Sequence, residues 1–467
     1  MGFKPIIIEQ FDTNFSTRSV AIMATKKQSA LLSDLHDANL MEILSSDDGC
    51  TVFSANNVVD YSYPTGIAII DYYLGYEVIV KDDNGNFVKK RLCLGLQAGT
   101  FNVITGATQS FKTTIGLQMI ANIAFKNDGN IYHYDAENRQ VLQRVKMLTG
   151  LPDDWFTGEH PRYVLRQGAI GYDTLQEDIT NIWKAKMMKR DILIRDTGEV
   201  DDHNRPIKLM PPTVIFLDSL SDIIAKEYDI NDRKTIENVD QLRTDTYGMR
   251  SAKTLRGVIT DILPMLKEAN ILFITIAHKG SNVAMNAFAG PKKQFQYGSH
   301  DEKMAGGKVV EYSASSVLNL TAEIREDSRY HIATDGFEGN TVLFEPIKVS
   351  TNESGNDKTG RGGRIVIDKR KDGVDNIRSL ILFMNQRGRL KGNKAGFRVI
   401  DKNGEPISGK FTWKTVYEDF ANDKATYKQF ILSAKEELES LVSVAYDNGN
   451  ISPFSIDQVL NDLSDVS

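Results

Sequence analysis

The sequence predicts an α/β protein with a central, mostly parallel and twisted sheet. Three short apolar runs, at 101–104, 213–217 and 271–277, have the length and composition of buried strands. Segments with apolar residues at helical spacing lie between them, and strands that alternate with helices are typical of parallel sheets. We expect three parts: an N-terminal oligomerisation segment at 1–60, the α/β core at 61–390, and a small α/β C-terminal domain at 391–467.

The composition is that of an ordinary globular protein. The chain has 467 residues, of which 41% are apolar and 9% aromatic, enough to bury a full core. No apolar run reaches the roughly 18 residues of a membrane-spanning helix, and the apolar part of the N-terminus is too short for a secretory signal. We therefore expect a cytoplasmic protein without a membrane partner, in the host cytoplasm if its source is viral.

Cysteine usage and charge exclude further classes. Cys50 and Cys93 are far apart and have no C-x-x-C or Cys/His spacing, which argues against a disulfide framework and a zinc site. The net charge of −6 argues against a generally basic coat for nucleic acid. Any contact with nucleic acid must therefore come from local basic segments.

The first part of the chain predicts two helices and a hairpin. An amphipathic segment at 31–44 should pack on the core or on a neighbouring subunit. Residues 64–75 have an apolar helical face that ends in a glycine. The strand-like segments 76–80 and 87–94 flank an Asn-Gly pair within 82–86, which indicates a hairpin turn.

A phosphate-binding loop is predicted directly after the apolar run 101–104. It has the spacing G-x-x-x-x-x-K-T and is followed by a helical segment at 115–124, so that it lies between a strand and a helix. In such a loop the backbone N–H groups wrap a di- or triphosphate, Lys112 reaches the terminal phosphates and the Thr113 hydroxyl binds Mg²⁺. The helix N-terminus adds a positive field. The predicted nucleotide contacts are Gly106, Ala107, Thr108, Gln109, Ser110, Phe111, Lys112, Thr113 and Thr114.

The loop departs from the usual motif at one position. Phe111 stands where a second glycine is expected, directly before the lysine. The alternative to a phosphate loop is a chance match of the spacing in an ordinary loop, and the motifs that follow argue against it.

Two acidic residues follow the next strand-like segment. Residues 131–137 end in Asp135, Ala136 and Glu137. The carboxyl ends of parallel strands face the ligand crevice, so an acid there is placed to act on a bound nucleotide. For Asp135 the alternative is a cap of the next helix. A helix-like region should then run to residue 189, and 190–210, which contains Asp196-Thr197-Gly198, should form a surface hairpin.

Two further strands end in polar residues. The run 213–217 ends at Asp218, a carboxylate placed to hold the hydration shell of Mg²⁺. After a polar stretch at 226–256 and an amphipathic helix at 255–269, the run 271–277 ends at His278. We expect His278 to sense the terminal phosphate, and the alternative is a structural histidine.

A long segment without periodicity at 279–307 predicts a functional loop, because long loops inside compact domains are usually functional. Its lysines alternate with aromatic residues, a pattern that suits single-stranded nucleic acid, where cations meet phosphates and rings stack on bases. The alternative is a merely solvated loop. The candidate contacts, including the lysine that follows, are Lys279, Lys292, Lys293, Phe295, Lys303 and Lys308.

The remainder of the chain predicts strands at 316–320 and 341–349, two more strands, and a helix. A turn is expected at 401–404 from its Asn-Gly pair, and the tail at 414–460 should be mostly helical and acidic.

The order of these motifs resembles that of the RecA-type strand-exchange recombinases: phosphate loop, Asp-Ala-Glu strand, Leu-Asp-Ser strand, Ala-His strand and basic glycine-rich loop. The resemblance is closest to the UvsX-type recombinases of T-even-like bacteriophages, whose phosphate loop has the same Ser-Phe-Lys as Ser110, Phe111 and Lys112. That similarity accounts for the missing glycine. The resemblance covers roughly residues 64–390, and a weaker similarity extends over 411–441.

The resemblance implies a RecA-like P-loop NTPase core with ATP and Mg²⁺ as cofactors. It implies that Lys112 and Thr113 bind phosphate and metal, that Asp218 supports the metal, that Glu137 polarises the attacking water, and that His278 couples the γ-phosphate to the DNA loop. Gly306 and Gly307 resemble the end of the second DNA-binding loop, and the polar stretch at 226–256 lies where the first should be.

Two positions depart from the family pattern. Arg144 stands where the family has an aromatic residue that stacks on adenine, and a guanidinium can also stack. The paired lysines that reach a neighbour's nucleotide have no clean counterpart. The candidates for that role are Lys348, Lys358 and Arg361.

The sequence therefore predicts a DNA-dependent ATPase that forms a helical filament on single-stranded DNA and pairs it with homologous duplex DNA, with mediator and single-strand-binding proteins as further partners. Two alternatives are a hexameric RecA-fold helicase or motor, and a nucleotide-dependent scaffold polymer without strand exchange.

Overall fold

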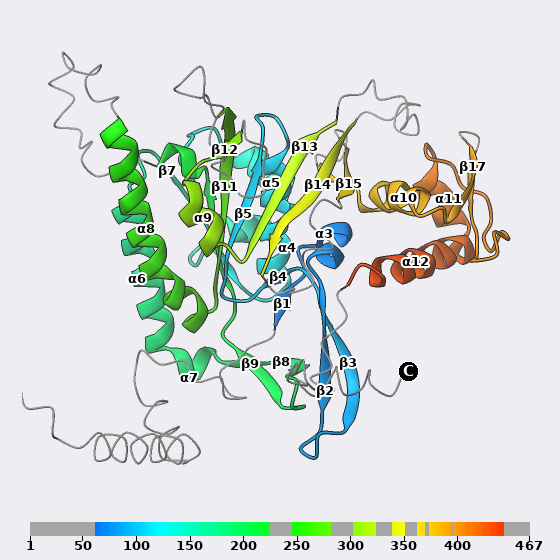
Figure 1. Cartoon of the computed structure of the whole chain (residues 1–467), viewed down its shortest axis with the longest axis horizontal. Coiled ribbons are helices and arrows are strands. Elements are labelled where there is room, and N and C mark those ends of the chain that lie inside the picture. Colours follow the sequence, from blue (N-terminus) through cyan, green and yellow to red (C-terminus); the bar gives the residue numbers. More distant parts are fainter. Residues whose placement is uncertain are drawn as a thin grey trace, which may run out of the picture. The chain divides into compact units, whose positions relative to one another are not determined.

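The structure is a computed structural model that describes residues 61–223, 245–281, 302–323, 339–350, 362–368, 373–393 and 396–442 (Figure 1). The predicted helix at 31–44 and most of the polar stretch at 226–256 lie outside these residues. The described residues all belong to one compact unit of the chain. The division into three parts remains a prediction.

A mixed, largely parallel sheet forms the centre of the described chain, which confirms the predicted α/β class. Nine strands follow one another in the order β16-β15-β14-β13-β5-β11-β10-β6-β7, and β12 pairs with the end of β11. The six strands from β13 to β7 are parallel, whereas β14, β15 and β16 are added antiparallel. The strands are β5 (Phe101–Gly106), β6 (Asn130–Asp135), β7 (Tyr163–Gln167), β10 (Thr213–Asp218), β11 (Ile271–Ser281), β12 (Glu302–Met304), β13 (Ser316–Ala322), β14 (Gly339–Val349), β15 (Gly363–Asp368) and β16 (Gly373–Val374).

Helices cover both faces of this sheet (Figure 1). On one face lie α4 (Lys112–Lys126), α5 (Leu142–Thr149) and α10 (Asn376–Gln386), and on the other α6 (Tyr172–Met188), α8 (Asp245–Glu268) and α9 (Gly307–Ser313). Successive residues of the central strands alternate between the two cores, as a pleated strand requires: Val214 and Phe216 face α4, and Ile215 and Leu217 face α6 and α8. The central strands have mostly apolar sequences because helices cover both faces of the sheet.

The elements before the phosphate loop agree with their prediction. Helix α3 (Ala68–Tyr73) precedes the antiparallel hairpin of β2 (Tyr76–Lys81) and β3 (Phe87–Cys93). The Asp82 carboxylate accepts the backbone N–H groups of Asn84 and Asn86, and Gly85 has a φ of +81°. Strands β1 (Ser62–Tyr63) and β4 (Leu96–Gln97) pair with each other directly before β5.

The prediction for the region after Glu137 is wrong in part. Instead of one helix-like region to residue 189, the chain forms α5, a 3-10 turn η1 (Asp153–Trp155), the edge strand β7 and then α6. Strand β7 was missed because only one side of it pairs within the described sheet and three of its five residues are exposed or polar. Its sequence therefore lacks the continuous apolar run that marks a central strand.

The predicted surface hairpin within 190–210 is confirmed, and the predicted end of the strand at 271–277 needs correction. A hairpin does follow α7 (Arg190–Leu193), formed by β8 (Arg195–Val200) and β9 (Pro206–Leu209). Its turn lies around Asp201, which accepts N–H groups of His203 and Arg205, whereas Asp196-Thr197-Gly198 lies within β8. Strand β11 does not end at His278 but continues to Ser281, because β12 pairs with its last residues.

The C-terminal elements confirm the predicted turn and the helical character of the tail up to residue 442, whereas residues 443–460 of the predicted tail lie outside the described residues. The turn at 401–404 closes a short β-bridge between Ile400 and Pro406. Phe397, Phe411, Phe420 and Phe430 share one aromatic cluster. The elements here are β17 (Leu390–Asn393), β18 (Gly396–Val399), α11 (Val416–Asn422) and α12 (Lys424–Glu439). Across the described part of the chain, no helix has both the length and the apolar character needed to cross a membrane.

Candidate nucleotide and metal site

The loop between β5 and α4 has the backbone of an anion-binding turn. Gly106 has a φ of +153°, and a Cβ there would lie 2.2 Å from the carbonyl oxygen of Leu320, so only glycine fits. Gln109 and Phe111 adopt left-handed conformations, with φ of 65° and 62°. Phe111 thus takes the backbone conformation that the expected second glycine would allow, and its ring packs against the core on the α4 face.

The loop presents free donors at the start of a long helix. Within the described residues, no acceptor lies within hydrogen-bond reach of the backbone N–H groups from Thr108 to Thr114, whereas the N–H of Ile115 donates to Phe111. Helix α4 has 15 residues, so its dipole adds to the field of these N–H groups. Free N–H groups at a helix N-terminus bind phosphate and other anions, and the loop therefore fits a phosphate group.

Lys112 is buried inside this loop. The residue is 4% exposed, and its Nζ donates to the carbonyl oxygen of Ala107 at 2.6 Å and approaches the Ser110 hydroxyl at 3.4 Å. Burial lowers the pKa of the ammonium, and the nearby Asp218 and Glu137 carboxylates oppose that shift. Among the described residues, the ammonium hydrogen-bonds only neutral groups, which leaves its charge available to an anion in the loop.

Thr113 and Asp218 form an oxygen pair next to Lys112. The Thr113 hydroxyl donates to Asp218 Oδ2 at 2.7 Å, which joins the first turn of α4 to the end of β10. Burial raises the pKa of Asp218 to about 6, the Thr113 hydrogen bond opposes the shift, and the charges of Glu137 and Asp135 add to it. A hydroxyl and a carboxylate are ligands that Mg²⁺ prefers, so these two residues could hold that ion.

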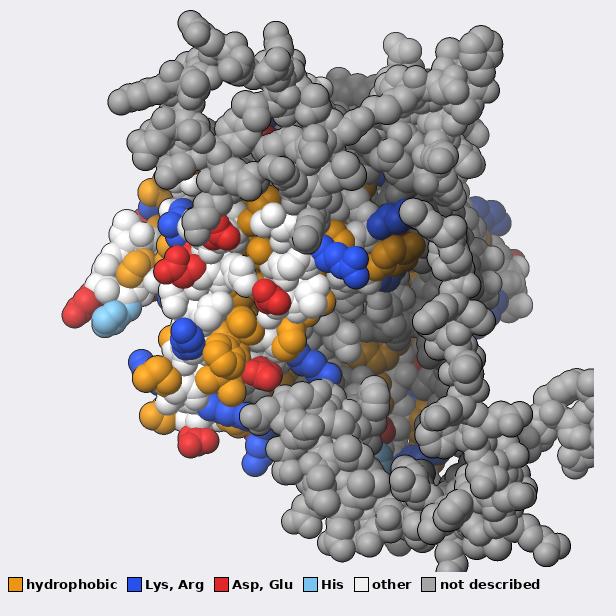
Figure 2. Space-filling view, turned by 60° about the vertical axis from the view of Figure 1, so that its left-hand side comes forward, with side chains coloured by type: hydrophobic (Ala, Val, Ile, Leu, Met, Phe, Trp, Pro, Cys, Tyr) orange, Lys and Arg blue, Asp and Glu red, His pale blue; other side chains and the backbone are white. Residues whose placement is uncertain are grey.

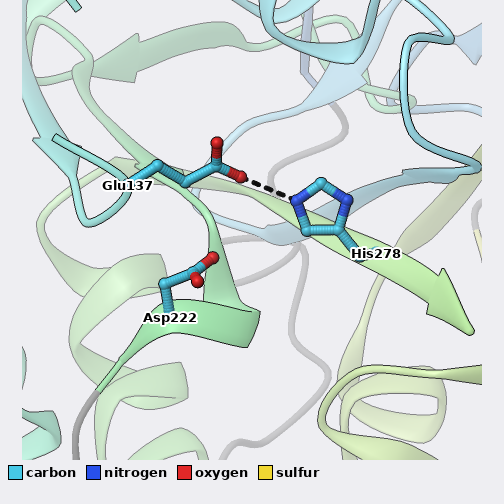
Figure 3. Close-up of side chains that lie close together, drawn as sticks. All are labelled: Glu137, Asp222 and His278. Atoms are coloured by element: carbon cyan, nitrogen blue, oxygen red, sulfur yellow. Dashed lines mark hydrogen bonds and ion pairs between the residues drawn. The ribbon is translucent and has the colours of Figure 1, made fainter. Parts of the chain in front are cut away.

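Glu137 and His278 meet across the end of β10. Glu137 Oε1 lies 2.8 Å from His278 Nε2, and its other oxygen lies 3.0 Å from the Arg139 guanidinium (Figure 3). The segment after β6 is fixed to β10, because the N–H groups of Ala136 and Glu137 point to the Asp218 carbonyl at 2.8 and 3.4 Å. The structure therefore brings Lys112, Thr113, Asp218, Glu137 and His278 to one edge of the sheet, although they come from four strand ends.

Asp135 plays a different part from Glu137. It is fully buried, and its Oδ2 accepts the backbone N–H of Gln140 and the side-chain amide of Gln167, both at 2.8 Å. These bonds hold the turn after β6 against β7. Asp135 does not cap α5, whose N-cap is Val141, but it fixes the turn before that helix, which leaves Glu137 as the acid that faces the crevice.

Arg144 is not joined to the loop. It lies on α5 with an exposed side chain, and among the described residues its guanidinium has no hydrogen-bond or ion-pair partner. Lys348, a candidate for a cross-subunit cation, donates to the carbonyl oxygens of Glu311 and Tyr312 at 2.9 and 2.7 Å and so caps α9. Lys358 and Arg361 lie outside the described residues.

The predicted DNA contacts are described in part. Lys279 is half-buried on β11, Gly306 and Gly307 have φ of +79° and +62° at the start of α9, and Lys308 is exposed. The backbone of Lys303 lies in β12, whereas its side chain and the residues Lys292, Lys293 and Phe295 lie outside the description.

A backbone hydrogen bond links the end of this segment to the site, because the Ala305 N–H donates to the His278 carbonyl at 3.1 Å. In the described part of the face that Figure 2 shows, basic side chains are intermixed with acidic and hydrophobic ones. This distribution agrees with the expectation that a contact with nucleic acid must be local.

Sequence reasoning missed Asp222 and Arg139. Asp222 ends the 3-10 turn η2 (Leu220–Asp222), and its carboxylate lies with Glu137 and His278 in a group whose ligand atoms are all within 4.8 Å of one another (Figure 3). An Asp in a turn is too common to signal a site. Only the position four residues after Asp218, on the same side of the sheet, could have indicated it.

Neither a comparison with protein-family models nor a comparison with curated proteins found a match for this chain.

Proposed function

We propose that this chain is a Mg²⁺-dependent ATPase with a RecA-like P-loop core, which binds single-stranded DNA as a filament and catalyses homologous pairing and strand exchange. One observation carries the ATPase part. Lys112, Thr113, Asp218, Glu137 and His278 gather at the carboxyl edge of neighbouring parallel strands, where open α/β sheets bind their ligands.

The loop residues supply binding. The free N–H groups of 108–114 and the Lys112 ammonium would hold the phosphates, with Lys112 exchanging its bond to Ala107 for one to a phosphate oxygen. Thr113 and Asp218 are the residues that would hold Mg²⁺, which neutralises developing phosphate charge when it is bound.

Glu137 is the residue proposed to orient the attacking water. In the structure its two oxygens pair with His278 and Arg139, and each oxygen keeps a second lone pair that can accept a hydrogen bond from a water. His278 is joined through its carbonyl to Ala305, at the end of the predicted DNA loop. We infer that a strand bound to this loop acts on Glu137 through His278.

The direct test is the Glu137→Gln variant. Glutamine keeps the size and the hydrogen bond to His278 but lacks the negative charge, so ATP should still bind while turnover falls by about 10²-fold or more, the usual scale for loss of a general base. Turnover should be measured by phosphate release with and without single-stranded DNA, and ATP binding by calorimetry.

Two variants serve as controls. Glu159→Gln makes the same change at an exposed loop position and should hydrolyse ATP like the parent. Lys112→Ala should not bind ATP, because the loop then has no side-chain cation. A parent-like rate for Glu137→Gln would overturn its assigned role, and ATPase activity that single-stranded DNA leaves unchanged would favour the scaffold alternative.

A further inference from the structure

Three side chains that could bind metal converge beside the proposed nucleotide site. Glu137 follows β6, Asp222 ends η2 after β10, and His278 lies on β11, and these three strands are neighbours in the sheet. Their ligand atoms all lie within 4.8 Å of one another (Figure 3). The residues are partly exposed, so an ion could reach them.

The backbone holds this arrangement in place from two sides. The Glu137 N–H points to the Asp218 carbonyl, and the His278 N–H points to the Ser221 hydroxyl at 3.4 Å. Asp222 is oriented by the Ser219 hydroxyl, which donates to its Oδ2 at 2.5 Å. When the ligand side chains are already in position, less of the binding free energy is spent on ordering them.

The spacing suits shared coordination. Glu137 Oε1 and His278 Nε2 are 2.8 Å apart, close to the separation of about 3 Å between adjacent ligands of an ion with bonds of roughly 2.1 Å. One imidazole and two carboxylates form a mixed donor set, because imidazole suits zinc and similar transition metals while carboxylate suits manganese and magnesium. Such a set favours a divalent transition metal over Mg²⁺, which prefers oxygen ligands and water.

A second group of the same composition lies at the β8–β9 turn and is less suited to bind a metal ion. It consists of Asp201, Asp202 and His203. The Asp201 carboxylate already accepts the N–H groups of His203 and Arg205 and pairs with the Arg205 guanidinium. Among the described residues, the one arginine or lysine paired with the Glu137 group is Arg139, whose side chain is 76% exposed and can swing away, and Asp222 accepts the neutral Ser219 hydroxyl.

We propose that Glu137, Asp222 and His278 form a cation site for a divalent transition metal of the manganese or zinc class, separate from the Thr113–Asp218 pair. Binding of the ion itself needs no nucleotide. A consequence that rests on the proposed function is that the bound ion occupies Glu137 and so inhibits ATP hydrolysis.

The test uses full-length, untagged, nucleotide-free protein titrated with Mn²⁺. Free Mn²⁺ is followed by electron paramagnetic resonance, and pulsed measurements detect nitrogen coupling from a bound imidazole. We expect one Mn²⁺ with such coupling. His278→Gln should remove the coupling. Asp222→Asn keeps an acceptor for Ser219 but loses a charged ligand, so it should weaken this binding at least on the order of 100-fold, the upper end of what loss of an outer-shell partner costs.

His203→Gln is the matched control and should leave both affinity and coupling unchanged. The proposal is overturned if the parent shows no nitrogen coupling, if the coupling survives in His278→Gln, or if it is lost in His203→Gln. Circular dichroism of each variant shows whether it is folded, and because Asp222→Asn and His278→Gln change partly exposed side chains, both should fold.

The inhibitory consequence is measured separately. Zn²⁺ added to the Mg²⁺-ATPase should inhibit the parent, and Asp222→Asn should require at least about tenfold more Zn²⁺ to lose the same fraction of its own Zn²⁺-free rate. Equal sensitivity of the two proteins would overturn the inhibitory role. If neither protein hydrolyses ATP, the proposed function fails, whereas the Mn²⁺ result still decides the metal site.

Discussion

At the scale of single residues, the candidate site holds a buried carboxylate, Asp218, whose ionised form is disfavoured by burial. Asp218 is 3% exposed, yet its carboxylate lies close enough to Glu137 and Asp135 for their charges to add to the effect of burial. Folded proteins tolerate such groups at functional sites at a cost in stability. The Asp218 and Glu137 carboxylates in turn favour the charged form of the buried Lys112 ammonium.

Replacement of Asp218 by Asn should therefore stabilise the protein at neutral pH. The pKa of Asp218 rises to about 6 in the folded state, so between about pH 4 and 6 the folded protein binds more protons than the unfolded chain, and stability falls as the pH rises through this window. The Asp218→Asn side chain does not ionise, so the variant does not lose this stability. Its free energy of unfolding should exceed that of the parent by at most about 3 kcal/mol at pH 8 and by almost nothing below pH 4.

Thermal unfolding of the nucleotide-free protein at pH 4 and pH 8 measures the effect. Asparagine retains an oxygen that can accept the Thr113 hydroxyl, so the hydrogen bond survives the change. Asp83→Asn, an exposed position on the β2–β3 turn, is the control and should not shift the midpoint. A lower melting temperature for Asp218→Asn at pH 8 would contradict the assignment of a destabilising carboxylate.

At the scale of elements, the central strands could be predicted from the sequence and the edge strand could not. The residues of β5, of β10 and of β11 up to Ala277 are buried, so each segment is mostly apolar, with a few buried polar residues such as Asn102 and Thr275. Strand β7 has one free side within the described sheet and a half-exposed face. A propensity argument has no means to separate such a strand from a helix turn or a loop.

Lys186 joins three elements and should contribute strongly to stability. It is 9% exposed on α6, and its Nζ donates to Pro211 O at 2.7 Å, to Thr213 Oγ1 at 3.1 Å and to Asn270 O at 3.3 Å. The acceptors lie before or at the start of β10 and before β11. Lys186→Met keeps the apolar stem but leaves buried acceptors without this donor, which should lower the free energy of unfolding by about 2 to 4 kcal/mol.

Urea unfolding checks this value. Lys184→Met changes an exposed lysine on the same helix and should stay within about 0.5 kcal/mol of the parent. If the two variants were equally stable, the Lys186 ammonium would not hold α6 to the sheet in solution.

At the scale of the whole molecule, the site depends on contacts that the sequence could predict only in outline. The carboxyl ends of parallel strands share one edge, so the sequence could place Lys112, Asp218, Glu137 and His278 near one another. It could not place Asp222, because the direction of the η2 turn depends on tertiary contacts such as the one between Ser221 and His278. Nor could it show that Asp135 faces Gln140 and Gln167 instead of the crevice.

The predicted DNA function belongs to the same scale, because it requires a strand bound by the segment 279–308 to affect the nucleotide site at the carboxyl edge of the sheet. Replacement of Lys292, Lys293 and Lys308 by Ala removes three potential phosphate contacts without touching Lys112 or Glu137. ATP affinity should remain near that of the parent. Single-strand binding should weaken, and each lost contact should flatten its salt dependence by roughly 0.7 log units per log unit of salt.

The matched control replaces three exposed lysines elsewhere, Lys89, Lys184 and Lys391, which changes the net charge equally. Binding titrations at several salt concentrations then separate a local contact from a general charge effect, since only a local contact changes the slope in one variant and not in the other. DNA-stimulated hydrolysis should be lost in the loop variant alone, because the Ala305–His278 hydrogen bond links this segment to Glu137. If the loop variant bound single-stranded DNA like the parent at every salt concentration, the strand would contact another part of the chain, and a scaffold polymer would become the better explanation of the site.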